Sequence, residues 1–217
     1  MHFSRNLLLL WIVGISFILI TYFWLDKDLS TFIYTHHWRE NLLQIPGLKI
    51  IIEWPPQAFH LAPIIFFTLL ISRCRKSSKN SQWQSMLLIL CLSVFLTHLL
   101  KDDMKWIFGR YWPTTWKNNN LSWINNQAYG YQWLQGKFFE GTDATGSFPS
   151  GHASVAFATF ISIGLCYPKS MKVCILLATL EALFMVAFNY HFLSDVIAGA
   201  CLGTTCAVLC YRLLSIR

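Results

Sequence analysis

Long apolar runs constrain the fold of this chain more than any other feature of its sequence. Six such segments occur, at 7–25, 58–72, 84–100, 152–167, 173–190 and 196–214. The first is about nineteen residues long, which is the length of helix that crosses the hydrocarbon core of a bilayer, roughly 30 Å thick. No small-residue cleavage site follows it, so we interpret it as a retained membrane anchor and not as a signal peptide.

The overall composition supports a membrane protein. Hydrophobic residues make up 55% of the chain and charged residues only 12%, whereas a soluble domain carries about 25% charged residues. We therefore predict an all-α, polytopic membrane protein whose six transmembrane helices form the core of a single domain, residues 1–217. The formal net charge is +7, but its position matters more than its total. We expect the lipid bilayer as the environment and no nucleic-acid partner, and the sequence indicates no protein partner.

Lysine and arginine are concentrated on one predicted side of the membrane. If the N-terminus lies inside, the inner pieces carry basic residues and no acidic residue; these pieces are 1–6, 73–83, 168–172 and 215–217. The outer loops, 26–57 and 101–151, mix both signs. Because basic residues favour the cytoplasmic side, we predict six spans in the cytoplasmic (inner) membrane with both termini cytoplasmic. The two long loops are then extracytoplasmic, which means periplasmic in a Gram-negative cell.

The two long outer loops and the last apolar segment carry features of their own. In the first loop, the stretch 42–52 is apolar enough to form an amphipathic helix along the membrane interface. The second loop is rich in Trp, Asn and Tyr and is too long for a simple connector. Its aromatic residues form either a belt at the lipid headgroups or the wall of a headgroup pocket, and the two interpretations are compatible. In the last segment, Gly199 and Gly203 have the spacing that lets membrane helices pack closely.

Three short clusters of polar residues lie at the outer ends of predicted helices. They are Lys105–Pro113, Pro149–His152 and Asn189–Asp195. The predicted topology, which rests on charge and hydropathy alone, puts all three at the same membrane face, so we expect them to form one site. The second cluster begins an apolar helix. Ser150 is a good helix cap, Gly151 lets a ligand approach the backbone, and the free N–H groups of such a helix end bind phosphate readily.

The side chains in these clusters suit phosphoryl transfer. His191 and Asp195 are four residues apart, so on a helix they share a face, and a carboxylate on one ring nitrogen leaves the other nitrogen free to attack. His152 can then protonate the departing oxygen. Lys105 and Arg110 can neutralise the phosphoryl oxygens. Since phosphoryl transfer depends mostly on positioning and charge stabilisation, we predict a phosphate-handling site here.

The clusters resemble the signature of the type 2 phosphatidic acid phosphatase superfamily of membrane lipid phosphatases, over about residues 80–210. That signature reads Lys-x6-Arg-Pro, then Pro-Ser-Gly-His, then Ser-Arg-x5-His-x3-Asp. The second motif matches fully at residues 149–152, and the third matches at His191 and Asp195. Integral members of the family have a six-helix transmembrane core, which agrees with the apolar segments of this chain.

The resemblance implies a role for each matching residue. His191 is the nucleophile that forms a phosphohistidine, Asp195 orients it, and His152 is the general acid. The phosphate is held by Lys105, Ser150 and Gly151. The reaction of the family needs no metal and no other cofactor.

Two arginines of the family signature are missing from their usual positions. In the first motif, Trp112 stands where the arginine is expected, and in the third, Phe184 and Met185 replace the Ser-Arg pair. We expect Arg110, two residues before Trp112, to substitute for the first arginine. For the second there is no firm candidate, although three lysines lie on the correct side: Lys101, Lys117 and Lys137. The phosphate pocket is therefore expected to be rebuilt, which affects substrate and rate more than reaction type.

We therefore predict a membrane lipid phosphatase that hydrolyses a phosphate monoester or diphosphate headgroup at the outer leaflet. The substrates that the resemblance implies are phosphatidylglycerophosphate, phosphatidic acid, undecaprenyl diphosphate and the phosphates of lipid A. The large Trp- and Asn-rich loop and the altered arginines favour a bulky, sugar-bearing headgroup such as that of lipid A.

Four alternatives stay open. The same intermediate passes its phosphoryl group to another lipid in a lipid-to-lipid phosphotransferase. A small transporter is a second alternative, although the ionisable residues cluster at one face and do not line a path. The missing arginines also permit an inactive, lipid-binding scaffold. A metal enzyme built on His152, His191 and Asp195 is the remaining chemical alternative.

Several other residues are expected to have structural and not catalytic roles. Glu181 falls near the middle of the fifth segment, where a charge costs at least a few kcal/mol. It lies about ten residues, or roughly 15 Å of helix, from His191, so we favour a structural role. The seven cysteines show neither a disulfide nor a zinc pattern and are expected to pack between helices. His36 and His37 have no third ligand spaced nearby and are expected at the surface.

Overall fold

The computed structural model of the protein describes residues 2–48, 64–65, 67–68, 82–115 and 120–215. Every regular element within these ranges is a helix, and β-type pairing is limited there to three isolated bridges between residues 110 and 146. The all-α class predicted from the sequence is therefore confirmed.

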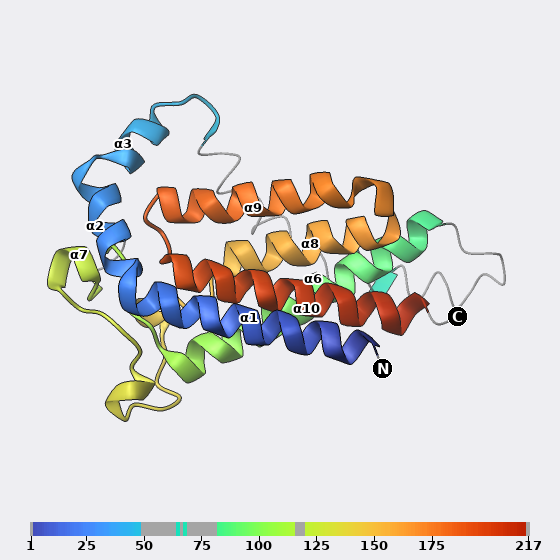
Figure 1. Ribbon diagram of the computed structural model, residues 1–217, viewed down its shortest axis with the longest axis horizontal. Coiled ribbons are helices and arrows are strands. Elements are labelled where there is room, and N and C mark those ends of the chain that lie inside the picture. The colour runs from blue at the N-terminus through green and yellow to red at the C-terminus, as the bar shows by residue number, and fades with distance from the viewer. Residues whose placement is uncertain (1, 49–63, 66, 69–81, 116–119, 216–217) are drawn as a thin grey trace.

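Long helices form the body of the molecule and run roughly along its long axis (Figure 1). Among the described residues they are α1 (His2–Trp24), α6 (Gln82–Phe108), α8 (Gly151–Cys166), α9 (Met171–Ala187) and α10 (Leu193–Ser215). The last of these, α10, packs against all four of the others, and α8 also packs on α6 and α9. The bundle is therefore built around α10 and α8.

Short helices lie at one end of this bundle (Figure 1). They are α2 (Asp26–Thr35), α3 (Trp38–Leu43) and α7 (Trp123–Asn126). Short 3₁₀ turns occur at Trp133–Gln135, Asp143–Thr145 and Pro168–Ser170. The start of α1 and the end of α10 lie at the opposite end of the bundle, so both described chain ends are on the same side.

Within the described residues, four segments are helical, long and apolar enough to cross a membrane: Arg5–Trp24, Gln82–Phe108, Pro168–Ala187 and Leu193–Leu214. Helix α8 is apolar but shorter. These helices support the membrane-protein character predicted from composition. The predicted segment 58–72 lies outside the described residues except for 64–65 and 67–68, so the count of six spans stays a prediction.

Helices α8 and α10 pack with almost no space between their backbones. A Cβ atom on Gly203 would lie 2.1 Å from the carbonyl oxygen of Ser154, and one on Gly199 would lie 2.6 Å from that of Ser150. The close helix packing predicted from these two glycines is confirmed. It holds the first turns of α10 against the start of α8, where two of the three polar clusters lie.

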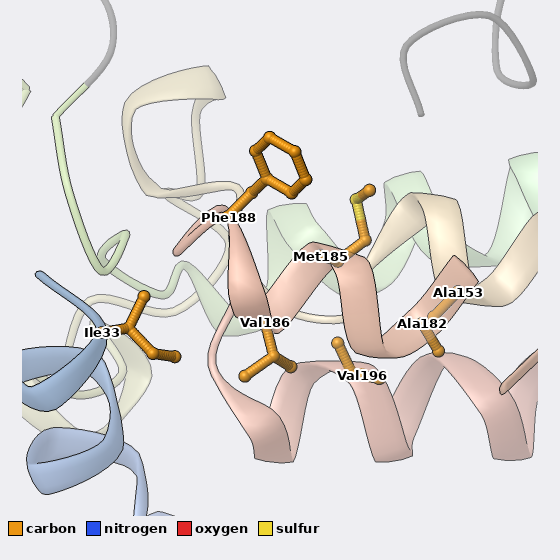
Figure 2. Packing of buried hydrophobic residues seen from close by; sticks show 7 residues of the cluster. All are labelled: Ile33, Ala153, Ala182, Met185, Val186, Phe188 and Val196. Carbon is orange, nitrogen blue, oxygen red and sulfur yellow. The ribbon is translucent and has the colours of Figure 1, made fainter. Parts of the chain in front are cut away.

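A buried apolar cluster packs α2 against the helix bundle (Figure 2). Its members are Ile33, Ala153, Ala182, Met185, Val186, Phe188 and Val196. The buried residues of α2 are Asp26, Ser30 and Ile33, and their spacing of four and three places them on one face of the helix. Burial of this face brings Asp26 into the interior of the protein.

In the loop that follows α1, helices begin earlier than the predicted segment 42–52. The continuous amphipathic helix predicted over 42–52 is not found, because α3 ends at Leu43 and residues 44–47 form turns; Leu48 is helical again, and 49–52 lies outside the described residues. Asp26 and Asp28 in the first turn of α2 favour this earlier start, because negative charge stabilises a helix N-terminus.

The structure also places the histidines, the glutamate and the cysteines for which structural roles were expected. His36 and His37 are exposed, as predicted. One carboxylate oxygen of Glu181 is buried without a hydrogen-bond partner among the described residues, and its structural role stays a prediction. Six cysteines are free, while Cys74 lies outside the described residues.

Candidate functional site

The three polar clusters of the sequence meet at one end of the helix bundle. Backbone hydrogen bonds join them: the Ser150 N–H donates to the carbonyl oxygen of Asp195 at 3.0 Å, and the Ser147 N–H donates to that of Arg110 at 3.2 Å. Residues after α6, before α8 and in the first turn of α10 therefore lie side by side. The membrane face to which this end belongs stays a prediction.

The two histidines of these clusters lie close enough to share a ligand. His152 is in the first turn of α8, and His191 lies in the short segment between α9 and α10. Their ring centroids are 6.4 Å apart, with 60° between the ring planes. A phosphoryl group between them can contact an edge of each ring, since a hydrogen bond spans about 2.7–3.2 Å.

His191 is held by its Nδ1 atom. That nitrogen lies 2.9 Å from the carbonyl oxygen of Ser147 and 3.8 Å from Oδ2 of Asp195. A carbonyl oxygen only accepts hydrogen bonds, so Nδ1 carries the hydrogen and Nε2 keeps its lone pair. The carboxylate expected from the sequence is present, but the nearest acceptor is the main-chain carbonyl, and Asp195 lies farther from the ring.

The environment of His191 favours its neutral form. The side chain is only 4% exposed. Burial lowers the pKa of His191 below its ordinary value, and the charge of Lys105 acts in the same direction, whereas Asp195 and the Ser147 carbonyl oppose them. A neutral imidazole is the form that attacks phosphorus, so this environment is compatible with the nucleophilic role of His191, which stays a prediction.

Asp195 is completely buried, and its two oxygens have separate partners. Oδ2 accepts hydrogen bonds from Oγ of Ser147 at 2.6 Å and from the N–H of Phe192 at 3.1 Å. Oδ1 accepts from Nη1 of Arg110. The carboxylate therefore has one orientation, with Oδ2 toward His191.

Arg110 lies in the protein interior beside Asp195. Its Nη2 donates to Oδ2 of Asp26 at 2.7 Å, and its Nη1 donates to Oγ of Ser194 at 2.6 Å. Four aromatic rings surround the guanidinium, with centroids 4.4–5.6 Å from it; they belong to Tyr22, Tyr129, Tyr131 and Phe192. Both terminal nitrogens thus have carboxylate partners. The predicted contact of Arg110 with substrate phosphate stays a prediction.

Trp112 occupies the position at which the family signature has arginine. Its ring centroid lies 5.1 Å from that of His191 and 5.7 Å from Nζ of Lys105. Its Nε1 donates to the carbonyl oxygen of Asp143 at 3.0 Å, which fixes the indole. At this position the site therefore offers an aromatic wall instead of a guanidinium.

Lys101 lies one helical turn before Lys105 on α6 and reaches the start of α8. A Cβ atom on Gly151 would meet Cδ of Lys101 at 3.4 Å. The ammonium group pairs with the exposed carboxylate of Asp102 at 2.6 Å. The positive charges of Lys101 and Lys105 both act on the imidazole of His152, so the two lysines contribute to one electrostatic environment.

Ser150 caps α8, as predicted from the sequence. It is completely buried, and its Oγ accepts from the N–H of Ala153 at 3.4 Å. Gly151 is the first residue of the helix. Because the first N–H groups of a helix have no intrahelical acceptor, this end of α8 is suited to bind an anion.

A metal-binding arrangement is not found in the described ranges: His, Cys, Asp and Glu side chains do not gather there in groups of three that could hold a metal ion. The metal-enzyme alternative on His152, His191 and Asp195 therefore gains no support from the geometry of these side chains.

Residues 84–217, which are more than half of the chain, match the family model of the PAP2 superfamily. This chain belongs to the PAP2 superfamily. The resemblance indicated by the sequence motifs is therefore confirmed.

Two known proteins are similar to this PAP2 chain. Lipid phosphate phosphatase 1 from Arabidopsis thaliana is 28% identical over 221 residues, which cover 92% of this chain and 63% of the relative. The chain thus spans less than two thirds of the length of that protein. A transmembrane PAP2 type phosphatidylglycerolphosphate phosphatase from Bacillus subtilis, known from a crystal structure, matches with a TM-score of 0.51 and 17% identity over 97% of both chains. At this low identity the likeness shows a shared fold.

Three residues of this PAP2 site were not identified from the sequence: Ser147, Asp26 and Ser194. Ser147 lies three residues before the α8 cap, and Asp26 directly follows the first apolar segment. For each of these two residues, this position in the sequence is the only local signal of a role in the site. Asp26 and its partner Arg110 are 84 residues apart, so their pairing could not be read from spacing. Of the other lysines considered, Lys137 is exposed and Lys117 lies outside the described residues.

Proposed function

We propose that this protein is a membrane lipid phosphatase that removes phosphate from a lipid headgroup through a phosphohistidine on His191. The observation that carries the proposal is the 6.4 Å separation of the His152 and His191 rings at one end of an apolar helix bundle. Membership of the PAP2 superfamily supports it, and both similar proteins named above are phosphatases by name.

The first step is attack of Nε2 of His191 on the phosphorus atom. A bond forms between Nε2 and phosphorus while the bond from phosphorus to the ester oxygen breaks, and His152 gives its proton to that oxygen. Acid catalysis of this kind typically contributes about 10²–10⁴-fold. The Ser147 carbonyl holds Nδ1 during the attack, and Asp195 stabilises the positive charge that develops on the ring. A phosphate dianion bound beside His152 favours the protonated form of that imidazole.

The second step releases the phosphate. A water molecule gives a proton to His152 and attacks phosphorus, the bond from phosphorus to Nε2 of His191 breaks, and inorganic phosphate leaves. His152 is then protonated again, so the cycle closes without another proton donor. If a lipid hydroxyl replaces the water, the product is a phosphorylated lipid. The phosphotransferase alternative therefore uses the same residues.

In this proposal, the phosphate oxygens are bound by the start of α8 and by two lysines. Ser150 and the neighbouring N–H groups provide neutral hydrogen-bond donors. Lys101 and Lys105 provide the positive charge, since both act on His152. Lys105 is the lysine of the first family motif, and Lys101 adds a charge to a site that lacks the signature arginines at the positions of Trp112 and Met185. A lysine binds phosphate as a point charge, without the paired hydrogen bonds of arginine, so weaker discrimination between phosphate geometries is expected.

The proposed substrate is a lipid phosphate at the extracytoplasmic face of the inner membrane. Exposed apolar side chains occur in the segment between α6 and α8, namely Leu121, Leu134, Phe138 and Phe139. Such a surface beside a phosphate site suits a headgroup whose acyl chains stay in the bilayer. The length of this segment favours a large headgroup such as lipid A; the other candidates are phosphatidylglycerophosphate, phosphatidic acid and undecaprenyl diphosphate.

Phosphate release from the purified protein in lipid nanodiscs tests this proposal, with each of the four lipid classes offered separately. We expect release from at least one of them. His191→Ala and His152→Ala should each reduce the rate at least about 100-fold. His36→Ala, an equivalent substitution at an exposed position after α2, should leave the rate unchanged.

The outcomes separate the alternatives. Unchanged release in both active-site variants would remove the proposed mechanism. A phosphorylated acceptor lipid in place of free phosphate would assign a phosphotransferase. Lipid binding without turnover of any substrate would assign a scaffold, and lipid movement across liposomes without turnover would assign a transporter.

A further inference from the structure

A buried ion network lies next to the nucleophile and joins two distant parts of the chain. Arg110 pairs with Asp195 through Nη1 and with Asp26 through Nη2, and all three side chains are completely buried. Asp26 is the first residue of α2 and lies outside residues 84–217, which match the family model. The N-terminal part of the chain therefore completes the surroundings of Asp195.

Asp26 is held as firmly as Asp195. Its Oδ1 accepts from the N–H of Ser194 at 3.1 Å, and its Oδ2 accepts from Nη2 of Arg110 at 2.7 Å and from Oγ of Ser194. Ser194 is in the first turn of α10 and precedes Asp195 in the sequence. Because each carboxylate oxygen has a hydrogen-bond donor, the burial of this charge is compensated by specific partners.

The charges of the network do not cancel. Two carboxylates face one guanidinium, so an excess of one negative charge stays in the interior. The adjacent ring that can become positive is His191, whose Nδ1 lies 3.8 Å from Oδ2 of Asp195. If Arg110 faced Asp195 alone, its charge would largely neutralise that carboxylate. Because Asp26 shares the guanidinium, Asp195 keeps negative charge toward His191.

We propose that Asp26 is a positioning residue of the active site, which acts through Arg110 to keep Asp195 negative toward His191 and so stabilises the positive ring of the phosphohistidine. Its effect on turnover rests on the proposed function, whereas its effect on the protonation of His191 does not. Arg110, which is buried, then has a role that requires no contact with substrate.

Charged groups on several elements act on His191, and Asp26 adds to their balance. Asp195 on α10, Lys105 on α6 and His152 on α8 act on the ring directly, whereas Asp26 on α2 acts on it through Arg110, which pairs with both carboxylates. The lysine and a protonated His152 disfavour positive charge on the His191 ring, whereas the two carboxylates favour it. Removal of one carboxylate therefore shifts the balance in a known direction.

The protonation of His191 can be measured directly by the ring ¹⁵N resonances of ¹⁵N-histidine-labelled protein, assigned by their loss in His191→Gln. Asp26→Asn removes the excess negative charge and should lower the titration midpoint of His191 by about half to one pH unit. Arg110→Gln leaves two carboxylates uncompensated and should raise it. The double variant keeps an excess of one negative charge and should return the midpoint to the wild-type value.

A matched control is available on the same helix. Asp28 is exposed and, like Asp26, lies in the first turn of α2, so Asp28→Asn makes the same change of charge and should leave the midpoint of His191 unchanged. If Asp26→Asn does not fold, as judged by its thermal unfolding, Asp26→Ser replaces it, since serine also removes the charge and leaves room for water.

The effect of Asp26 on the protonation of His191 and its effect on turnover are tested separately. Midpoints that do not move in opposite directions in the two single variants overturn the role of Asp26, even if phosphate release is normal. If the wild-type protein lacks phosphatase activity but the midpoints of His191 shift as expected in the variants, the role of Asp26 in the protonation of His191 is supported and the proposed function is removed. In an active enzyme, Asp26→Asn should lower kcat about tenfold with little change in KM; an equal loss in Asp28→Asn would indicate a general effect on folding and would also overturn the role of Asp26.

Discussion

The Nδ1 atom of His191 lies 2.9 Å from the carbonyl oxygen of Ser147. The hydroxyl of the same serine donates to Oδ2 of Asp195 at 2.6 Å, so one residue holds the His191 ring with its main chain and the Asp195 carboxylate with its side chain. The N–H of Ser147 in turn donates to the carbonyl oxygen of Arg110. Ser147 therefore connects the parts of the site that come from three different stretches of the chain.

Ser147→Ala removes the hydroxyl but leaves the carbonyl that accepts from His191. A buried carboxylate oxygen of Asp195 then loses one of its donors, and a hydrogen bond to a charged group is worth about 1.5–3 kcal/mol. We expect kcat to fall by about 10- to 100-fold with a smaller change in KM, because the lost bond orients the site and does not bind substrate. Steady-state kinetics of folded protein provide the measurement. A normal kcat would show that Ser147 acts through its main chain alone.

The pH dependence of activity follows from the burial of His191. Burial lowers the pKa of His191 below its ordinary value of 6.5, and protonation would occupy the lone pair that attacks phosphorus. Activity should therefore rise with pH along an acid limb whose midpoint, in the profile of kcat/KM, lies below pH 6.5, and fall at higher pH, where His152 loses the proton that it gives to the leaving oxygen. Initial rates between about pH 4 and pH 8 give this midpoint. A midpoint above the ordinary value would contradict the neutral, buried nucleophile.

Lys101 should contribute to phosphate binding, although no family motif includes it. Its side chain lies against Gly151 at the start of α8, and its charge acts on His152. Lys101→Met should raise KM about tenfold, which corresponds to the loss of about 1.4 kcal/mol of binding, while Lys101→Arg should keep most of the affinity. Lys169→Met, at an exposed position at the other end of α8, is the control. Equal effects of both methionine variants would point to overall charge and not to a contact.

Features set by residues close in the sequence could be predicted. The cap at Ser150 and the close packing at Gly199 and Gly203 were predicted because each depends on local residue types and on helical spacing. The meeting of the three polar clusters was predicted because the topology derived from hydropathy and from the distribution of basic residues puts all three at the same membrane face. These predictions needed no knowledge of which side chains touch.

The surroundings of Arg110 could not be predicted, because they depend on the direction of the chain after α6. Gly109 has a φ of +52°, a conformation that glycine adopts readily, and it turns the chain just before Arg110. The backbone of Arg110 then pairs with Tyr131 and Gly146, and its side chain meets Asp26 in the interior. Sequence spacing shows that a cation lies near the motif, but it does not show whether the side chain faces the substrate or the interior.

The contact of α8 with α10 sets the separation of the two histidines, since each helix begins beside one of them. Gly203→Ala would place a Cβ atom 2.1 Å from the carbonyl oxygen of Ser154, so the helices must move apart. We expect a loss of about 1–3 kcal/mol in the free energy of unfolding, as for other overpacked sites, and a fall in kcat as His152 moves away from His191. Thermal unfolding and kinetics of the variant measure both. Leu209→Ala, on an exposed position of α10, is the control and should change neither by a comparable amount; a stable, fully active Gly203→Ala protein would show that this helix contact does not govern the spacing of the histidines.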